Sequence, residues 1–126
     1  MSEESIKGFI ERDDTAKEMI KHAEGLAKKL EKVTTSQMRN AYGTVKKIEM
    51  SGLSETALRQ LLLLKPKMSY TQARINNKDA ATAYKELATD IGLAIDAISL
   101  KDPQTFVRFC NFFEAVVAYH KLHSKS

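Results

Sequence analysis

The residues of this 126-residue chain that could do chemistry are mainly cations, and they gather in its middle. Residues 32–78 carry nine Lys or Arg against two Glu, a net charge of +7. Residues 1–31 carry six cations and eight acids, and residues 79–126 carry five and six. A local excess of positive charge attracts polyanions even when the net charge of the whole chain, here +4, is modest. The pattern favours a surface that binds phosphates.

Seven of these cations are candidates for contacts with a nucleic-acid backbone. On a helix, successive residues turn by about 100°, which directs the cations near residues 39–47 away from the apolar stripe of the same segment. Two more cations flank a proline, and the last two follow in the next turns. Cations in series can follow a phosphate backbone without reading bases. The candidate residues for these nucleic-acid contacts are Arg39, Lys46, Lys47, Lys65, Lys67, Arg74 and Lys78.

The same residues have simpler interpretations. A lysine-rich helical face can serve solubility alone, although solvating faces usually mix charges of both signs. A helical scaffold or adaptor whose basic face binds an acidic protein partner is the alternative function. Tyr42 and Tyr70 could stack on bases, but core packing is the preferred interpretation of both. The single sign of the charge favours a nucleic-acid partner.

Residues that could catalyse a reaction or hold a metal are few. His120 and His123 share a helical face, but no carboxylate or thiolate pair near them completes a metal site. Cys110 has no base near it in the sequence, so burial among aromatic residues is the better interpretation. His22, between lysines and glutamates, is expected on the surface. Because the chain has no glycine-rich phosphate loop either, we expect no enzymatic activity, no metal and no other cofactor.

The elements that position these residues are predicted to be helices. The chain has two prolines and five glycines and is rich in strong helix formers. Apolar residues recur at intervals of three and four over about 6–33, 34–50, 54–74, 79–100 and 103–122. A break in the first segment is possible near Asp13-Asp14. We predict an all-α fold, a single compact bundle of about five helices that forms one domain over residues 1–126.

The third predicted helix contains the run of leucines at 61–64 followed by Lys65-Pro66-Lys67. We expect the leucines in the core. Pro66 cannot donate a backbone hydrogen bond, which predicts a kink between Leu62 and Pro66. The kink would turn Lys65 and Lys67 outward, toward the cations of the preceding helix.

The last predicted helix is apolar on two sides, which is typical of a helix at the centre of a bundle or at an interface with another copy. Phe112 and Tyr119 are the residues whose burial would argue for the core. The N-terminal sequence MSEESIKGFIERDD is unlike a secretory signal, and no stretch reaches the length of a membrane span. We expect a cytoplasmic protein without a membrane partner.

Three stretches of the sequence, in this order, resemble one known family. They are Thr34-Thr35-Ser36 followed by Arg39, then Leu64-Lys65-Pro66-Lys67 followed by Arg74, and the aromatic run Phe112–Tyr119. Together they resemble the small subunit of the type III-A CRISPR effector, the Csm complex. The resemblance covers about residues 33–121. It departs from the family at Gln72-Ala73, where an alanine-glycine pair is usual.

The resemblance implies a small helical bundle without nuclease activity. It also implies several copies stacked along an antiviral ribonucleoprotein, lining the path of the target RNA and the guide–target duplex through backbone contacts. The implied partners are guide RNA and target RNA, the backbone and large subunits of the Csm complex, and neighbouring copies of the same chain.

Overall fold

The computed structural model describes residues 3–123, which form six α-helices and one 3₁₀ turn. The all-α class is confirmed for these residues, whereas the expected first helix is two helices separated by the turn. The elements are α1 (Glu3–Glu11), the 3₁₀ turn (Asp13–Thr15), α2 (Ala16–Lys29), α3 (Thr35–Ser51), α4 (Glu55–Ala73), α5 (Lys78–Asp96) and α6 (Gln104–His123).

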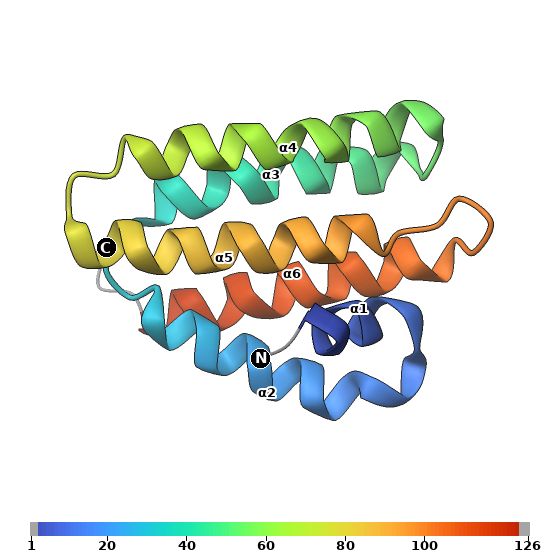
Figure 1. Cartoon of the computed structure of the whole chain (residues 1–126), viewed down its shortest axis with the longest axis horizontal. Helices are drawn as coiled ribbons and strands as arrows, with labels where there is room; N and C mark the ends of the chain where they lie inside the picture. Colours follow the sequence, from blue (N-terminus) through green and yellow to red (C-terminus); the bar gives the residue numbers. More distant parts are fainter. Residues whose placement is uncertain (1–2, 124–126) are drawn as a thin grey trace.

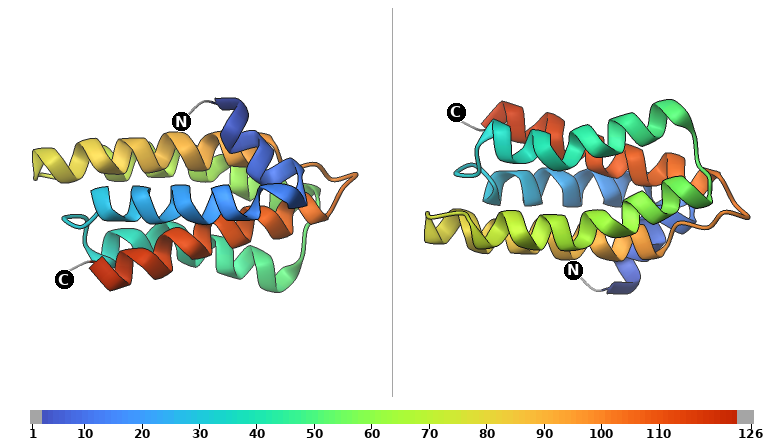
Figure 2. Two further views of the ribbon diagram at one scale, coloured as in Figure 1. Left: turned by 90° about the horizontal axis from the view of Figure 1, so that it is seen from below. Right: turned by 90° about the horizontal axis from the view of Figure 1, so that it is seen from above.

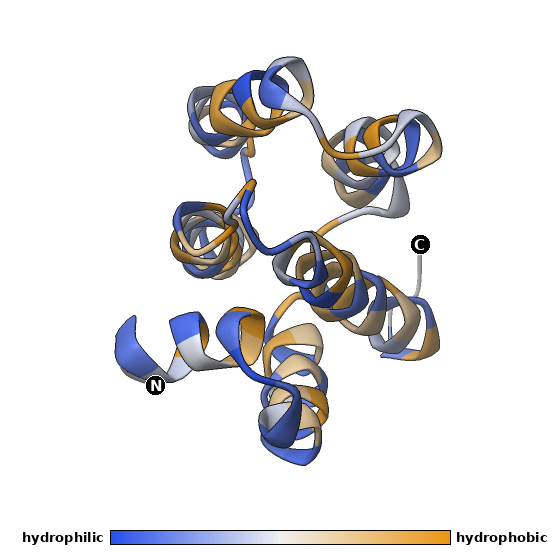
Figure 3. Cartoon of the chain, turned by 90° about the vertical axis from the view of Figure 1, so that its right-hand side faces the viewer, coloured by the Kyte–Doolittle hydropathy of each residue, from blue (hydrophilic) through white to orange (hydrophobic). Residues whose placement is uncertain are grey.

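Helix α6 lies at the centre of the bundle, in contact with α1, α2, α3 and α5. Helix α4 is held by α3 and α5, on the side of the molecule away from α1 and α2 (Figure 1). Viewed along the bundle, polar and apolar segments alternate around the helices, as amphipathic helices require (Figure 3). The basic segment of the sequence, residues 32–78, contains α3 and α4, and these two helices form one layer of the molecule.

The aromatic residues of α6 form the middle of the core. Phe109, Phe112 and Phe113 are fully buried, and the rings of Phe109 and Phe113 meet edge to face with centroids 6.3 Å apart. Cys110 is buried beside them, as expected. Tyr119 is half-buried. The apolar character of this helix is thus explained by its central position, and Phe112 is not available to a second copy.

Polar side chains cap the N-termini of α3, α4 and α5. The Thr34 hydroxyl accepts from the Gln37 amide at 3.1 Å, and the Gln37 side-chain oxygen accepts from the Thr34 amide at 2.9 Å. This reciprocal pair is a capping box. Ser54 and Asn77 cap α4 and α5 in the simpler way, each accepting one backbone N–H.

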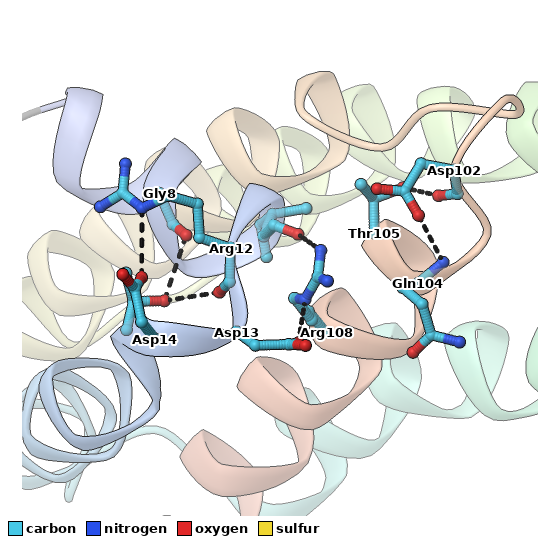
Figure 4. Close-up of polar contacts among 10 residues, drawn as sticks. Gly8, Arg12, Asp13, Asp14, Asp102, Gln104, Thr105 and Arg108 are labelled. Atoms are coloured by element: carbon cyan, nitrogen blue, oxygen red, sulfur yellow. Dashed lines mark hydrogen bonds and ion pairs between the residues drawn. The ribbon is translucent and has the colours of Figure 1, made fainter.

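The N-terminal region is tied to α6 by one arginine (Figure 4). Arg108 Nε lies 2.7 Å from a carboxylate oxygen of Asp13, and Arg108 Nη1 donates to the Ile10 carbonyl at 2.9 Å. The Thr15 hydroxyl donates to the Gly8 carbonyl at 3.1 Å. The break that the sequence suggested near Asp13-Asp14 is therefore an ordered turn that docks α1 onto the bundle.

The leucine run is only half in the core. Leu61 and Leu64 are buried, but Leu62 and Leu63 are 44% and 50% exposed, so the expectation of four core leucines is wrong. The reason is the helical period, since four consecutive residues cover the full circumference of a helix. Helix α4 continues through Pro66 as one element.

Two histidines lie inside the bundle. His22 Nε2 is 2.7 Å from an Asp90 carboxylate oxygen, and its ring packs against those of Phe9 and Phe112, which also contact each other. The expectation of a surface histidine is wrong, because α2 turns this residue toward α5 and α6. His120 is buried, with Nε2 2.7 Å from the Val33 carbonyl oxygen. None of the helices in residues 3–123 has the length and apolar character needed to cross a bilayer.

Candidate nucleic-acid interface

Helices α3 and α4 are joined by a short connection at residues 52–54 and diverge from it (Figure 2, right). Gly52 has φ +90°, a conformation that residues with a side chain rarely adopt. The Gly52 amide donates to the Ile48 carbonyl at 2.9 Å, which closes the end of α3. This turn sets the directions of the two helices that carry most of the candidate cations.

The three candidate cations of α3 fall into two groups. Arg39 and Lys47 are exposed, and their side chains make no ion pair or hydrogen bond within residues 3–123. Lys46 instead lies 2.9 Å from a Glu49 carboxylate oxygen and 5.8 Å from the centroid of the Tyr42 ring. The hydrogen bond to Glu49 raises the pKa of Lys46. Because Tyr42 packs on Phe113 of α6, Lys46 leans toward α6 rather than toward α4.

The two lysines around Pro66 lie on different sides of α4. Lys65 Nζ lies 2.9 and 3.1 Å from the two carboxylate oxygens of Asp96, on the side of α5. Lys67 lines a groove on the side of α3. Residues two positions apart on a helix, such as these lysines, are separated by about 200° of rotation. The expectation that both lysines join the cations of α3 is therefore wrong for Lys65.

The end of α4 carries an arginine stacked on a tyrosine. Arg74 Nη1 donates to the Tyr70 hydroxyl at 3.2 Å, and its guanidinium carbon is 5.6 Å from the centroid of the Tyr70 ring. Tyr70 is 64% exposed, so its expected core packing is wrong. Lys78, the first residue of α5, is exposed, and its side chain makes no ion pair or hydrogen bond within the described part of the chain.

A groove of about 400 Å³ separates α3 from α4. Its walls are mostly apolar, and Lys67 is the one charged residue among those that line it. Tyr84 of α5 lies beneath, fully buried, and its hydroxyl makes no hydrogen bond within residues 3–123. Burial raises the pKa of Tyr84, and the Thr71 hydroxyl beside it partly opposes this rise.

The sequence did not single out Tyr84, because it falls on the apolar stripe of α5 like any core residue. Its only distinguishing sign is a hydroxyl at a position where an aliphatic residue would serve. The structure brings Lys67 and Tyr70 to the α4 side of the groove, and Arg74 is bonded to Tyr70. Lys47 follows Thr44, which lines the α3 side, by one turn.

Cys110 and Thr34, two residues whose side chains could take part in chemistry, have structural roles in the described residues. Burial is the main cause that raises the pKa of the Cys110 thiol to about 12, so the nucleophilic thiolate is strongly disfavoured. No three His, Cys, Asp or Glu side chains of residues 3–123 gather as metal ligands would. The Thr34 hydroxyl is used by the capping box. Cationic side chains are thus the groups that this surface offers.

One comparison with known proteins gives a match. A family model described as Csm2 Type III-A matches residues 13–126, which include all of α2 to α6. No curated protein and no solved structure matches the chain.

Proposed function

Because the chain belongs to the Csm2 family, the small subunit of the type III-A Csm complex, we propose that it is a non-catalytic RNA-binding subunit. In this role the layer of α3 and α4 lies against the guide–target duplex or the target strand. Base pairing between guide and target reads the sequence, so the subunit needs contacts with phosphates only. Its other partners would be the backbone and large subunits and neighbouring copies of itself.

The observation that carries this proposal is the set of cations without intramolecular partners on α3, on α4 and at the start of α5. A lysine that is already paired with a carboxylate must give up that partner to bind a phosphate, whereas an unpaired one need not. Lys67 and the exposed residues Arg39, Lys47 and Lys78 have no such partner within residues 3–123. Arg74, held on the Tyr70 ring, keeps donors for a phosphate because its guanidinium has five N–H groups.

The pattern of paired and unpaired cations ranks the seven candidates. Lys46 and Lys65 hold Glu49 and Asp96 at 2.9 Å and would contribute less than the others. No carboxylate lines the groove to repel an incoming phosphate. The proposed phosphate track therefore runs over Lys47, Lys67 and Arg74 and ends near Lys78, whereas Arg39, seven residues before Lys46 on α3, lies on the face of Lys46 and away from the groove.

The test is the affinity of the assembled complex for target RNA at several salt concentrations. In the Lys47→Glu/Lys67→Glu variant, affinity should fall by an order of magnitude or more at low salt. For each phosphate that a variant no longer neutralises, the slope of log affinity against log salt decreases by about 0.7 for a single strand. A slope reduced by one to two units is expected for the pair.

A matched control reverses two exposed lysines far from this layer, Lys17 of α2 and Lys101 of the α5–α6 loop. The Lys17→Glu/Lys101→Glu variant has the same net charge and should keep wild-type affinity and slope. If the two double variants weakened RNA binding equally, the loss would follow from net charge alone and the proposed phosphate track would be wrong. Unchanged RNA binding together with a lost acidic protein partner would favour the adaptor alternative.

A further inference from the structure

The outer face of α4 is apolar although it points away from the bundle. Leu62, Leu63 and Tyr70 are 44%, 50% and 64% exposed. Because successive residues turn by about 100°, Pro66, Tyr70 and Ala73 fall in the sector between the two leucines, opposite the buried side of the helix. A helix that is apolar on all sides is normally covered on all sides. The outer face therefore indicates contact with another macromolecule.

The charges on this face are arranged from one end to the other. Glu55, in the first turn of α4, is exposed and falls in the same sector, as does Arg59 one turn later. The side chains of these two residues make no ion pair or hydrogen bond within residues 3–123. Arg74, just after the last turn, has its side chain bonded to Tyr70. The face thus begins with an unpaired acid and ends with a cation.

A second copy of the chain complements this pattern when the two α4 helices pack antiparallel. In a contact with two-fold symmetry, each pair of facing residues is made twice. In the register that sets the first turn of one helix against the end of the other, the facing pairs are Glu55–Arg74, Arg59–Tyr70 and Leu63–Pro66. These are an ion pair, a cation on an aromatic ring and an apolar contact at the symmetry axis. A crossing angle of about 20° keeps two helices in contact along such a length.

Other occupants fit the face less well. Two copies packed in parallel would set Glu55 against Glu55 and Arg74 against Arg74, so that like charges repel. An acidic protein would leave Glu55 without a counterpart. RNA offers few apolar groups to cover the leucines, and Glu55 repels its phosphates. The antiparallel second copy is the occupant that pairs both ends of the face.

We propose that two copies of the free chain associate antiparallel through the outer face of α4. The inference goes beyond the proposed function, which concerns the chain within the complex. Arg74 belongs to both surfaces, and in the pair of copies it is held by Glu55 of the other copy. Association and RNA binding therefore compete for this arginine, a step that rests on the proposed phosphate track.

The experiment is sedimentation velocity of the full chain at increasing concentration and low salt. Wild-type chain should shift from monomer to dimer. Glu55→Arg and Arg74→Glu each set like charges against one another at two positions and should weaken association at least about tenfold. The Glu55→Arg/Arg74→Glu variant restores both ion pairs in the opposite sense and should associate like the wild-type chain.

This set of variants excludes two simpler explanations. The single variants change the net charge in opposite directions, so net charge alone cannot weaken association in both. A rescue within one chain is also excluded, because a helix of 19 residues separates Glu55 from Arg74 by about 28 Å. Recovery in the double variant would therefore require a contact between two copies.

A second pair of variants tests the apolar centre of the face. Leu63→Ser removes the contact at the symmetry axis and should weaken association at least about tenfold. The matched control is Leu122→Ser on α6, which changes a leucine that is 74% exposed and lies outside the face, and it should have no effect. Circular dichroism should show wild-type helix content in both. Added oligouridine should convert wild-type dimers into RNA-bound monomers.

The possible failures point to different errors. A wild-type chain that stays monomeric at every concentration overturns the inference, and so does a double variant that fails to recover. RNA bound by intact dimers overturns the competition for Arg74. If Leu63→Ser associates normally but does not enter the assembled complex, the face receives another subunit and the inference is wrong. The proposed function is tested separately, by the Lys47→Glu/Lys67→Glu variant in the assembled complex.

Discussion

At the scale of single residues, burial changes the chemistry of Cys110. The thiol is 4% exposed, and desolvation, reinforced by the charge of Glu49, raises its pKa from 9.0 to about 12. Between these pH values the unfolded thiol has lost its proton while the folded thiol keeps it. The unfolded state then binds fewer protons, so the free energy of unfolding falls as pH rises, by about 1.4 kcal/mol per pH unit at most.

The measurement for Cys110 is urea denaturation from pH 8 to pH 11. Because lysines and tyrosines also titrate there, the expected result is a difference: stability should decline less steeply with pH in Cys110→Ala than in the wild-type chain. Parallel pH profiles for the two chains would show that the thiol is not the cause. At pH 7, the native thiol should react with iodoacetamide only as fast as the chain unfolds.

The lysines on either side of Pro66 provide a comparison between two similar residues. Lys67→Ala should weaken RNA binding by the assembled complex more than Lys65→Ala, because Lys65 already holds Asp96 and faces α5. An exposed ion pair contributes about 0–1 kcal/mol, so Lys65→Ala should also change stability only slightly. Binding titrations of the two variants check the order, and a larger effect at Lys65 would move the RNA path to the α4–α5 side.

At the scale of helices, the start of α3 depends on the Thr34 capping box. Thr34→Ala removes a side-chain acceptor from the first turn and should lower the free energy of unfolding by about 1 kcal/mol. Ser36→Ala, two residues away on the exposed surface, is the matched control and should have little effect. Thermal or urea denaturation measures both. Equal stability of the two variants would mean that core contacts alone fix this helix end.

The extent of the helices after residue 33 was largely predictable from the sequence, because several of their boundaries have a local cause. Thr34, Ser54 and Asn77 cap helices, and Gly52 ends one. The side on which a residue lies was harder to predict. His22 appeared polar in its sequence neighbourhood, but Asp90, 68 positions away, gives it an internal partner.

The candidate site was predictable as a list of cations but not as an arrangement. Composition and spacing indicated which residues carry charge, whereas the pairing of Lys65 with Asp96 depends on how α4 and α5 pack. The groove depends on the divergence of α3 from α4 above a residue of a third helix, Tyr84. Local periodicity contains no information on such three-helix arrangements.

At the scale of the whole molecule, α1 completes the core although the family match begins at residue 13. Ile6, Phe9 and Ile10 are at most 3% exposed, and α1 contacts both α5 and α6. Burial of one such side chain stabilises a fold by about 1.5–3 kcal/mol, an upper estimate. The helix therefore contributes a sizeable part of the roughly 5–15 kcal/mol typical of a domain.

Removal of residues 1–12 should consequently lower the free energy of unfolding by several kcal/mol or abolish cooperative unfolding. Urea denaturation followed by circular dichroism checks this result. Lys7→Ala breaks only the exposed pair with Glu3 in the same helix and should have little effect. A truncated chain as stable as the full chain would mean that the other helices do not need α1 for their stability.

The continuity of α4 through Pro66 has a consequence for motion. Pro66 has no N–H, so the Leu62 carbonyl lacks its helical partner within a helix that elsewhere follows the regular pattern. The turn around the proline is held by the burial of Leu61, Leu64 and Met68 rather than by its backbone. Amide hydrogens in this turn should exchange with deuterium faster than those in the middle of α5. The wall of the groove that includes Pro66 is thus the part of the bundle able to open locally, without unfolding of the core beneath it.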